Sequence, residues 1–220
     1  MIESVLPGLK RLGFDGIPSV RKALVTCCVK VLGVVFEGGV GGGGGGEGED
    51  MDVVVDAEAA MQVDEGVNGE GYMSYEPFVP ALLSHVMGMM CDDVVDVKEL
   101  ALQEMSGLAE VYFKAAGESV FKFGQGDAGA LISMYYGKLL RLLIDDATHW
   151  TQGQREKSLK TLKVLVEYGG GEREDGKNIV LGDLEILLSC LAGSVRDDEE
   201  EIRDGAEAVA KCLGFKLEGR

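Results

Sequence analysis

The sequence contains few of the residues that commonly carry chemistry. Its 220 residues include two histidines, one tryptophan and four prolines, and 6% of them are aromatic. The histidines, His85 and His149, lie far apart, and helical periodicity brings together no Cys-His or Ser-His arrangement. Carboxylate pairs occur only in predicted helix caps and in one glycine-rich tract. These absences favour a protein that is not an enzyme, and we expect neither a cofactor nor a metal.

The cysteines also lack a functional pattern. They are odd in number, show no C-x-x-C spacing and lie in apolar stretches, which is typical of small buried side chains in a reduced, intracellular protein. The five are Cys27, Cys28, Cys91, Cys190 and Cys212.

Basic residues are scarce, with 21 Lys and Arg against 38 Asp and Glu. Nucleic acids and anionic membrane surfaces both require a basic footprint, so neither is an expected partner. The N-terminus carries Glu3 and no signal-peptide core. The most apolar stretch, residues 23–36, is interrupted by Lys30 and is shorter than the roughly 20 residues that span a bilayer. We expect a soluble, cytoplasmic protein.

The chain does contain one helical pattern, repeated four times. Each copy begins with a pair whose second residue is basic, and apolar or small residues follow four and eleven positions after the first member of the pair. The basic residues are 77, 57 and 48 positions apart, and the first spacing is 43 without an intervening tract of 34 residues. Two-helix HEAT repeats have a period of roughly 40 to 47 residues. The pattern predicts an all-α fold, a right-handed α-solenoid of about four HEAT-type helix pairs. The copies begin at Val20-Arg21, Val97-Lys98, Gln154-Arg155 and Ile202-Arg203, with Leu24, Ala101, Ser158 and Ala206 four positions on and Val31, Leu108, Leu165 and Leu213 eleven on.

The intervening tract, Gly38 to Gly71, departs from this pattern. It contains six consecutive glycines, Gly41 to Gly46, and nine acidic residues but no Lys or Arg. Such a segment has too much backbone freedom to order itself, which predicts a disordered insertion. A phosphate-binding loop would need a following Lys-Ser or Lys-Thr, which is absent here. The predicted organisation is therefore a first helix pair (residues 1–37), the insertion (38–71) and three further helix pairs (72–220).

Turn residues and apolar spacing predict the helices of each pair. The first pair is expected at residues 3–13 and 19–37, with Gly33 near its end, and the second opens near Tyr75 and stops around Gly117. Each later helix should bury the residues that share one face. These predicted core residues are Val97, Ala101, Met105, Leu108 and Tyr112, then Leu131, Tyr135, Leu139 and Leu142, then Leu184, Leu187, Leu188 and Leu191, and finally Ile202, Ala206, Val209 and Leu213.

Caps should fix the helix ends in the last two pairs. Thr151 with Gln154 three residues later matches a capping box, in which the hydroxyl and the amide satisfy each other's backbone N–H groups. The two residues Asp198 and Glu201 form a second capping pair. The glycine run from Gly169 to Gly171 is expected to end the helix of the third pair, and Gly214 that of the fourth.

The segment DDEEEIRDGAEAVAKCLG, residues 197–214, resembles a HEAT repeat of the ARM-like class. Residues 75–214 are similar to the HEAT-repeat dynein axonemal assembly factor family, in which an acidic turn, a tryptophan, an arginine and a lysine recur. Asp96-Val97-Lys98 matches an aspartate-valine step of that family, with lysine where arginine is commoner, whereas Gln154 and the glycine tract depart from it. The residues that match the recurring set are Asp146, Trp150, Arg155 and Lys157.

The resemblance implies a non-catalytic, protein-binding scaffold for the cytoplasmic preassembly of axonemal (ciliary) dynein arms. Its expected partners are dynein chains and chaperone-type assembly factors. A generic HEAT/ARM adaptor, such as a phosphatase scaffold, a transport receptor or a chaperone cofactor, is the alternative.

Six residues are candidates for a repeat ladder or for partner contact. An arginine after an acidic turn is expected to bond to the preceding repeat's aspartate or to helix-end carbonyls, which would align the repeats. Trp150 is either a plug between repeats or a contact point for a partner. The doublets Asp145-Asp146 and Asp197-Asp198 are explained by helix capping rather than by metal binding. The six candidates are Lys98, Asp146, Trp150, Arg155, Lys157 and Arg203.

Both ends of the array resemble internal repeats rather than polar caps. We therefore expect a piece of a longer array, or a divergent short gene model, with exposed apolar surface at its ends. The residues behind this expectation are Leu6, Leu9 and Leu12 at one end and Ile202, Val209 and Leu213 at the other.

Overall fold

The computed structural model describes most of the predicted helix pairs, namely residues 8–9, 11–13, 15–40, 78–116, 127–169 and 178–218. Within these ranges the chain forms helices and turns and no strand, which confirms the predicted all-α class. No helix in them is long and apolar enough to cross a membrane. The predicted insertion lies outside the described residues from position 41 onward.

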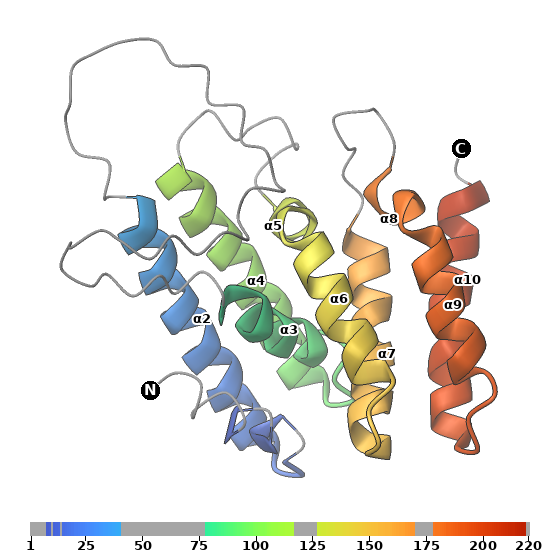
Figure 1. Ribbon diagram of the computed structural model, residues 1–220. Coiled ribbons are helices and arrows are strands. Elements are labelled where there is room, and N and C mark those ends of the chain that lie inside the picture. Colours follow the sequence, from blue (N-terminus) through green and yellow to red (C-terminus); the bar gives the residue numbers. More distant parts are fainter. Residues whose placement is uncertain are drawn as a thin grey trace, which may run out of the picture.

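The helices follow one another in short hairpins (Figure 1). Residues 8–9 and 11–12 are helical and lead through a turn into α2. We name residues 8–40 hairpin 1, α3 with α4 hairpin 2, α5 to α7 hairpin 3, and α8 to α10 hairpin 4. The bounds are α2 Pro18–Val40, α3 Val79–Met89, α4 Val95–Ala116, α5 Ala128–Met134, α6 Tyr136–Ala147, α7 Gln152–Tyr168, α8 Ile179–Gly182, α9 Leu184–Ser194 and α10 Glu200–Glu218.

Hairpins that are neighbours in the sequence are also neighbours in space. Helix α2 packs against α3 and α4, α3 packs against α6 and α7, and α7 packs against α10. Figure 1 shows the same order from blue α2 to red α10. The buried apolar side chains form one continuous core that runs through all four hairpins.

The predicted core faces of the later second helices are confirmed except at Tyr112, which is half-buried while its neighbour Phe113 is buried. In α4, Ala101, Met105 and Leu108 are buried, because the spacing of four and three residues keeps them on one side of the helix. The same spacing buries Ile202 and Val209 in α10. In hairpin 1 the pattern was misaligned, since Val31 is 41% exposed while Cys28 and Leu32 are buried.

The first helix of hairpin 3 is broken in two, where the sequence predicted one. Asp127 caps α5 by accepting the Ala130 N–H at 2.9 Å. Tyr135 has φ −98° and ψ 7°, so it interrupts the helix between α5 and α6. The break changes which side of α6 faces the core. Tyr136 is buried, whereas the predicted core residues Tyr135 and Leu142 are only half-buried.

Several helix boundaries also differ from the prediction. Helix α2 passes Gly33 and runs to Val40, three residues into the predicted insertion. Helix α10 passes Gly214 and ends at Glu218. A glycine inside a helix weakens it by only about 1 kcal/mol, so packing overrides the signal. Gly169 does end α7, as predicted, and its N–H bonds to the Leu165 carbonyl at 2.8 Å.

Two glycines set the approach of neighbouring hairpins. A Cβ atom at Gly205 of α10 would lie 3.1 Å from the Leu159 Cβ of α7. A Cβ at Gly88 of α3 would lie 3.0 Å from the Lys157 Cε and 3.2 Å from the Thr161 Oγ1 of α7. These contacts are closer than nearly all real Cβ contacts, so the missing side chains allow α7 to touch both neighbours.

Apolar surface is exposed on the first and last hairpins, although largely at other residues than those expected. Ile202, Val209 and Leu213 are buried inside hairpin 4, and Leu6 lies outside the described residues. Leu9 is half-buried and Leu12 is 42% exposed. The other exposed apolar side chains at the two ends are Ile17, Val31 and Val34 in hairpin 1 and Ile186, Leu188, Val195, Phe215 and Leu217 in hairpin 4.

Adjacent leucines of α9 provide a test of this packing. The sequence predicted that both face the core, but Leu187 is fully buried and Leu188 is 51% exposed. Leu187→Ala should lower the free energy of unfolding by about 2–5 kcal/mol because it leaves a cavity. Leu188→Ala should change it by less than about 0.5 kcal/mol. Urea unfolding of both variants, monitored by circular dichroism, measures the difference. An equal loss of unfolding free energy in the two variants would contradict the orientation of α9, in which Leu187 faces the core and Leu188 faces solvent.

Candidate functional site

The turns between the helices of each pair share one hydrogen-bond arrangement. In each turn, the residue six positions before the basic residue of the repeat accepts the backbone N–H two residues further on. This is the bond of an Asx turn, and a ring nitrogen replaces the carboxylate in one case. The four pairs are Asp15 with Ile17 (2.7 Å), Asp92 with Val94 (2.9 Å), His149 with Thr151 (3.2 Å) and Asp197 with Glu199 (3.1 Å).

The arginines that follow these turns donate hydrogen bonds back to the carbonyl groups of the turns. Each arginine donates from its Nη1 to backbone carbonyls five or six residues earlier. Bonding to carbonyls near the helix ends was one of the two alternatives that the sequence predicted. The contacts are Arg21 to Asp15 O (2.5 Å), Arg155 to His149 O (3.1 Å) and Trp150 O (3.2 Å), and Arg203 to Asp197 O (2.8 Å) and Asp198 O (2.9 Å).

Two of these arginines also bind the turn of the next hairpin. The Nε and Nη2 atoms of Arg21 lie 2.7 and 3.0 Å from the two carboxylate oxygens of Asp92. Arg155 approaches Asp197 with the same two atoms: its Nη2 donates a hydrogen bond to Oδ1 at 3.1 Å, and its Nε lies at ion-pair distance, 2.9 Å from Oδ2. We call such a two-point Arg–Asp pair a rung. Each rung reaches the following hairpin, so the prediction of a bond to the preceding repeat was wrong.

No rung joins hairpins 2 and 3. Lys98 replaces the arginine, and His149 replaces the aspartate of the turn, so the two positions carry no opposite charges at this junction. Lys98 is exposed and makes no ion pair with any described residue. At this junction α3 packs against α6 and α7, and α4 packs against α5. The Cys91 thiol donates to the Lys160 carbonyl at 3.2 Å, and the Lys160 Nζ lies 3.9 Å from the exposed Asp93 carboxylate.

Asp146 and Lys157 belong to a different part of the structure from the rungs. Together with His85 they line a small cavity of about 20 Å³ between α3, α6 and α7, which has room for about one water molecule. Asp146 accepts a hydrogen bond from Gln154 Nε2 at 2.5 Å, inside the same hairpin. The sequence grouped Asp146 with the ladder, but His149 occupies the turn position that corresponds to Asp92 and Asp197.

The predicted capping pairs are also replaced by these turns. Thr151 makes no side-chain cap and is paired instead with His149, whose Nδ1 lies 2.8 Å from the Thr151 Oγ1. At the start of α10 the capping carboxylate is that of Asp197, bonded to the Glu199 N–H, rather than that of Asp198. In the sequence these turns are marked by the shared offset of six residues between the turn residue and the basic position.

Trp150 lies beside a surface groove between hairpins 3 and 4. Its side chain is 83% exposed, so the prediction of a plug between repeats was wrong. The His149 ring lies 5.6 Å from it, centroid to centroid, at 34°. The groove has a volume of about 520 Å³, and we call it the Trp150 groove. It is lined by Ala147, Thr148, His149, Trp150 and Arg155 of hairpin 3 and by Cys190, Gly193, Ser194, Arg196, Asp197, Asp198 and Glu199 of hairpin 4.

The groove combines an exposed aromatic ring with fixed charges. The Arg155–Asp197 rung forms part of the lining of the groove, and both side chains are less than one-fifth exposed. The Glu199 N–H and the Arg155 guanidinium hold the pKa of Asp197 below its usual value. Arg196, Asp198 and Glu199 supply further charges around the opening. The arrangement suits the binding of a polypeptide segment that combines an apolar side chain with polar groups.

The cysteines and acidic residues form no reactive centre in the described part of the chain. Burial raises the pKa of the Cys28 thiol to about 12 and that of Cys91 to about 11, so both are protonated at neutral pH. The described cysteines are all free, and Cys27 is exposed. Among these residues no group of three or more His, Cys, Asp or Glu is placed to hold a metal ion.

Comparison with known proteins gives no relative: no protein-family model matches the chain, and no curated protein matches it. The resemblance to HEAT repeats and to the dynein assembly factor family therefore stays a prediction from the residues themselves.

The rung between hairpins 3 and 4 predicts a pH dependence. Because the folded protein lowers the pKa of Asp197, its carboxylate stabilises the fold above the unfolded-state pKa of about 3.9, and this contribution is lost as the pH falls through the folded-state pKa. Asp197→Asn should be less stable than the parent by about 1 kcal/mol at pH 7, with the difference shrinking toward zero near pH 3.

Denaturant unfolding across this pH range measures the effect. Asp198→Asn is the matched control, because the Asp198 carboxylate makes no bond to Arg155. A difference for Asp197→Asn that is independent of pH would contradict the assigned rung.

Proposed function

We propose that the four hairpins are HEAT-type repeats of a right-handed α-solenoid that acts as a non-catalytic protein-binding scaffold. Three observations support the solenoid: neighbouring hairpins pack in chain order, their turns share one Asx bond, and two of the three junctions carry the same Arg–Asp rung. Because each repeat contacts only its neighbours, such an array presents an elongated surface to other polypeptides.

The exposed Trp150 beside its groove is the observation that carries the binding function. Tryptophan and arginine are enriched among the residues that dominate binding energy at protein interfaces. Elsewhere the large aromatic side chains of hairpins 2 and 3 pack inward, as Tyr112 does edge-to-face on Phe36 at 4.8 Å. At 83% exposure the Trp150 ring, which touches His149, leaves most of its surface available to a partner.

The proposed clients are dynein heavy or intermediate chains, bound in the cytoplasm during preassembly of ciliary dynein arms. The support is the similarity of residues 75–214 to the assembly factor family, and Trp150 and Arg155 of that motif both line the groove. A generic HEAT/ARM adaptor, such as a phosphatase scaffold or a transport receptor, would use the same surface for other proteins.

A capture experiment with matched variants tests both levels of the proposal. Trp150→Ala should reduce co-purification of dynein heavy and intermediate chains from ciliated cells at least about tenfold, as expected for a dominant interface residue. Its free energy of unfolding should stay within about 0.5 kcal/mol of the parent, since the ring is exposed.

Phe215→Ala is the matched control because Phe215 is another exposed aromatic residue, at 73%, that does not line the groove. It should leave capture unchanged. Equal capture by all three proteins would reject the groove as the site. Capture of phosphatase or transport subunits in place of dynein chains would reject the client but keep the scaffold.

A further inference from the structure

The turn of hairpin 4 contains the arginine of a rung, Arg203, without the aspartate. Arg203 donates its Nη1 to the Asp197 and Asp198 carbonyls, as Arg155 does to the carbonyls of its own turn. In Arg155 the remaining Nε and Nη2 bind the aspartate of the next hairpin. Among the described residues no carboxylate lies within hydrogen-bond distance of these two atoms of Arg203. The guanidinium is therefore held in its turn, with two donors available.

Apolar side chains share the face of Arg203. Ala210 and Leu217 follow it at intervals of seven residues on α10, and both are exposed. The residue seven positions after Arg155, Leu162, is fully buried by comparison. On α9, Leu188 and Val195 are 51% and 53% exposed and are also seven residues apart. They lie on the opposite side of the buried stripe from Cys190 and Gly193, which line the Trp150 groove toward α6.

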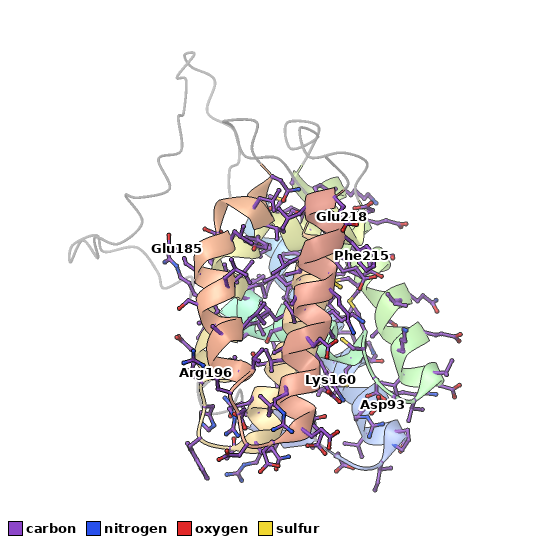
Figure 2. All side chains as sticks on the ribbon, turned by 90° about the vertical axis from the view of Figure 1, so that its right-hand side faces the viewer. Asp93, Lys160, Glu185, Arg196, Phe215 and Glu218 are labelled. Atoms are coloured by element: carbon purple, nitrogen blue, oxygen red, sulfur yellow. The ribbon has the colours of Figure 1, made fainter. Side chains whose placement is uncertain are left out.

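Figure 2 looks onto this end of the molecule. Helices α9 and α10 stand side by side in front, with Arg196 at the lower end of α9 and Phe215 near the upper end of α10, and no described element covers them. We call the surface formed by Arg203, Ala210 and Leu217 of α10 with Leu188 and Val195 of α9 the end face.

Hairpin 1 carries the aspartate of a rung, Asp15, without the arginine. Asp15 has the same turn as Asp92 and Asp197, with its Oδ1 on the Ile17 N–H at 2.7 Å. No cation of the described residues lies within ion-pair distance of its carboxylate. Ile17 beside it is 58% exposed, and an apolar pocket of about 370 Å³ opens between Leu9 and Leu12 on one side and α2 on the other. The two ends thus match in charge, in turn geometry and in apolar character.

The geometry points to head-to-tail association of this chain, in which the end face of one copy receives hairpin 1 of a second copy and Arg203 forms a rung with Asp15. The occupant is defined by the internal junctions, where the same arginine atoms bind the same type of turn aspartate. Because the two contacting surfaces differ, the association is heterologous and can add further copies. It is independent of client binding, since the Trp150 groove lies between hairpins 3 and 4.

Sedimentation velocity of the 220-residue chain, from low to high micromolar concentration, tests this inference. The parent should show a sedimentation coefficient that rises with concentration. Arg203→Asp and Asp15→Arg should each weaken association at least about tenfold, because each places like charges in contact. A chain that carries both substitutions should associate again, because the pair is restored with its charges exchanged.

Arg141→Asp is the control: it makes the same charge change on an exposed residue of α6, outside the end face and hairpin 1, so association should be unchanged. Should Asp15→Arg lose helical circular dichroism, Leu188→Glu replaces it, because this exposed residue can change without unfolding the chain. A monomeric parent at every concentration would overturn the inference. Association of Arg203→Asp or of Leu188→Glu to the same extent as the parent would also overturn it. A double variant that folds but stays monomeric would do the same.

Discussion

The structure depends on apolar side chains that are covered only by the adjacent hairpin. Leu159 of α7 is fully buried because Gly205 lets α10 approach it, and Met105 of α4 is buried on the side that its heptad spacing predicts. Burying such a side chain contributes about 1.5–3 kcal/mol, whereas a partly exposed ion pair contributes about 0–1 kcal/mol. Apolar burial therefore holds the hairpins together, and the arginine rungs decide how they are aligned.

Arginine suits this alignment because its guanidinium has several donors in one plane. In Arg21 one nitrogen binds the carbonyl of its own turn and two bind Asp92 of the next turn, so a single side chain fixes two turns relative to each other. A lysine ammonium cannot offer this fork, and Lys98 remains in solvent. At that junction the alignment comes from packing instead, with Gly88 of α3 against Lys157 and Thr161 of α7.

Periodicity was sufficient to predict the helical class, the core face of α10 and most of that of α4, because burial of one stripe depends only on local spacing. It failed where two signals compete. Leu187 and Leu188 both fit the apolar pattern, and only the packing of α9 against α6 and α10 decides which is buried. Of the candidate site residues, Trp150 and Arg155 meet at one groove, but Asp146 was misassigned because the turn position belongs to His149, a residue that composition alone does not identify as an equivalent of aspartate.

The turn of hairpin 3 departs from the repeated pattern. His149 takes the place of the turn aspartate, and Thr151 bonds to that ring instead of capping α7. Natural sequences commonly break their own local rules at functional sites, where another requirement overrides stability. Here the same substitution that removes the aspartate of the turn places the His149 ring 5.6 Å from Trp150. The irregular turn and the exposed tryptophan are thus one local feature, and for this reason we propose this groove, rather than the regular turns of hairpins 1 and 2, as the binding site.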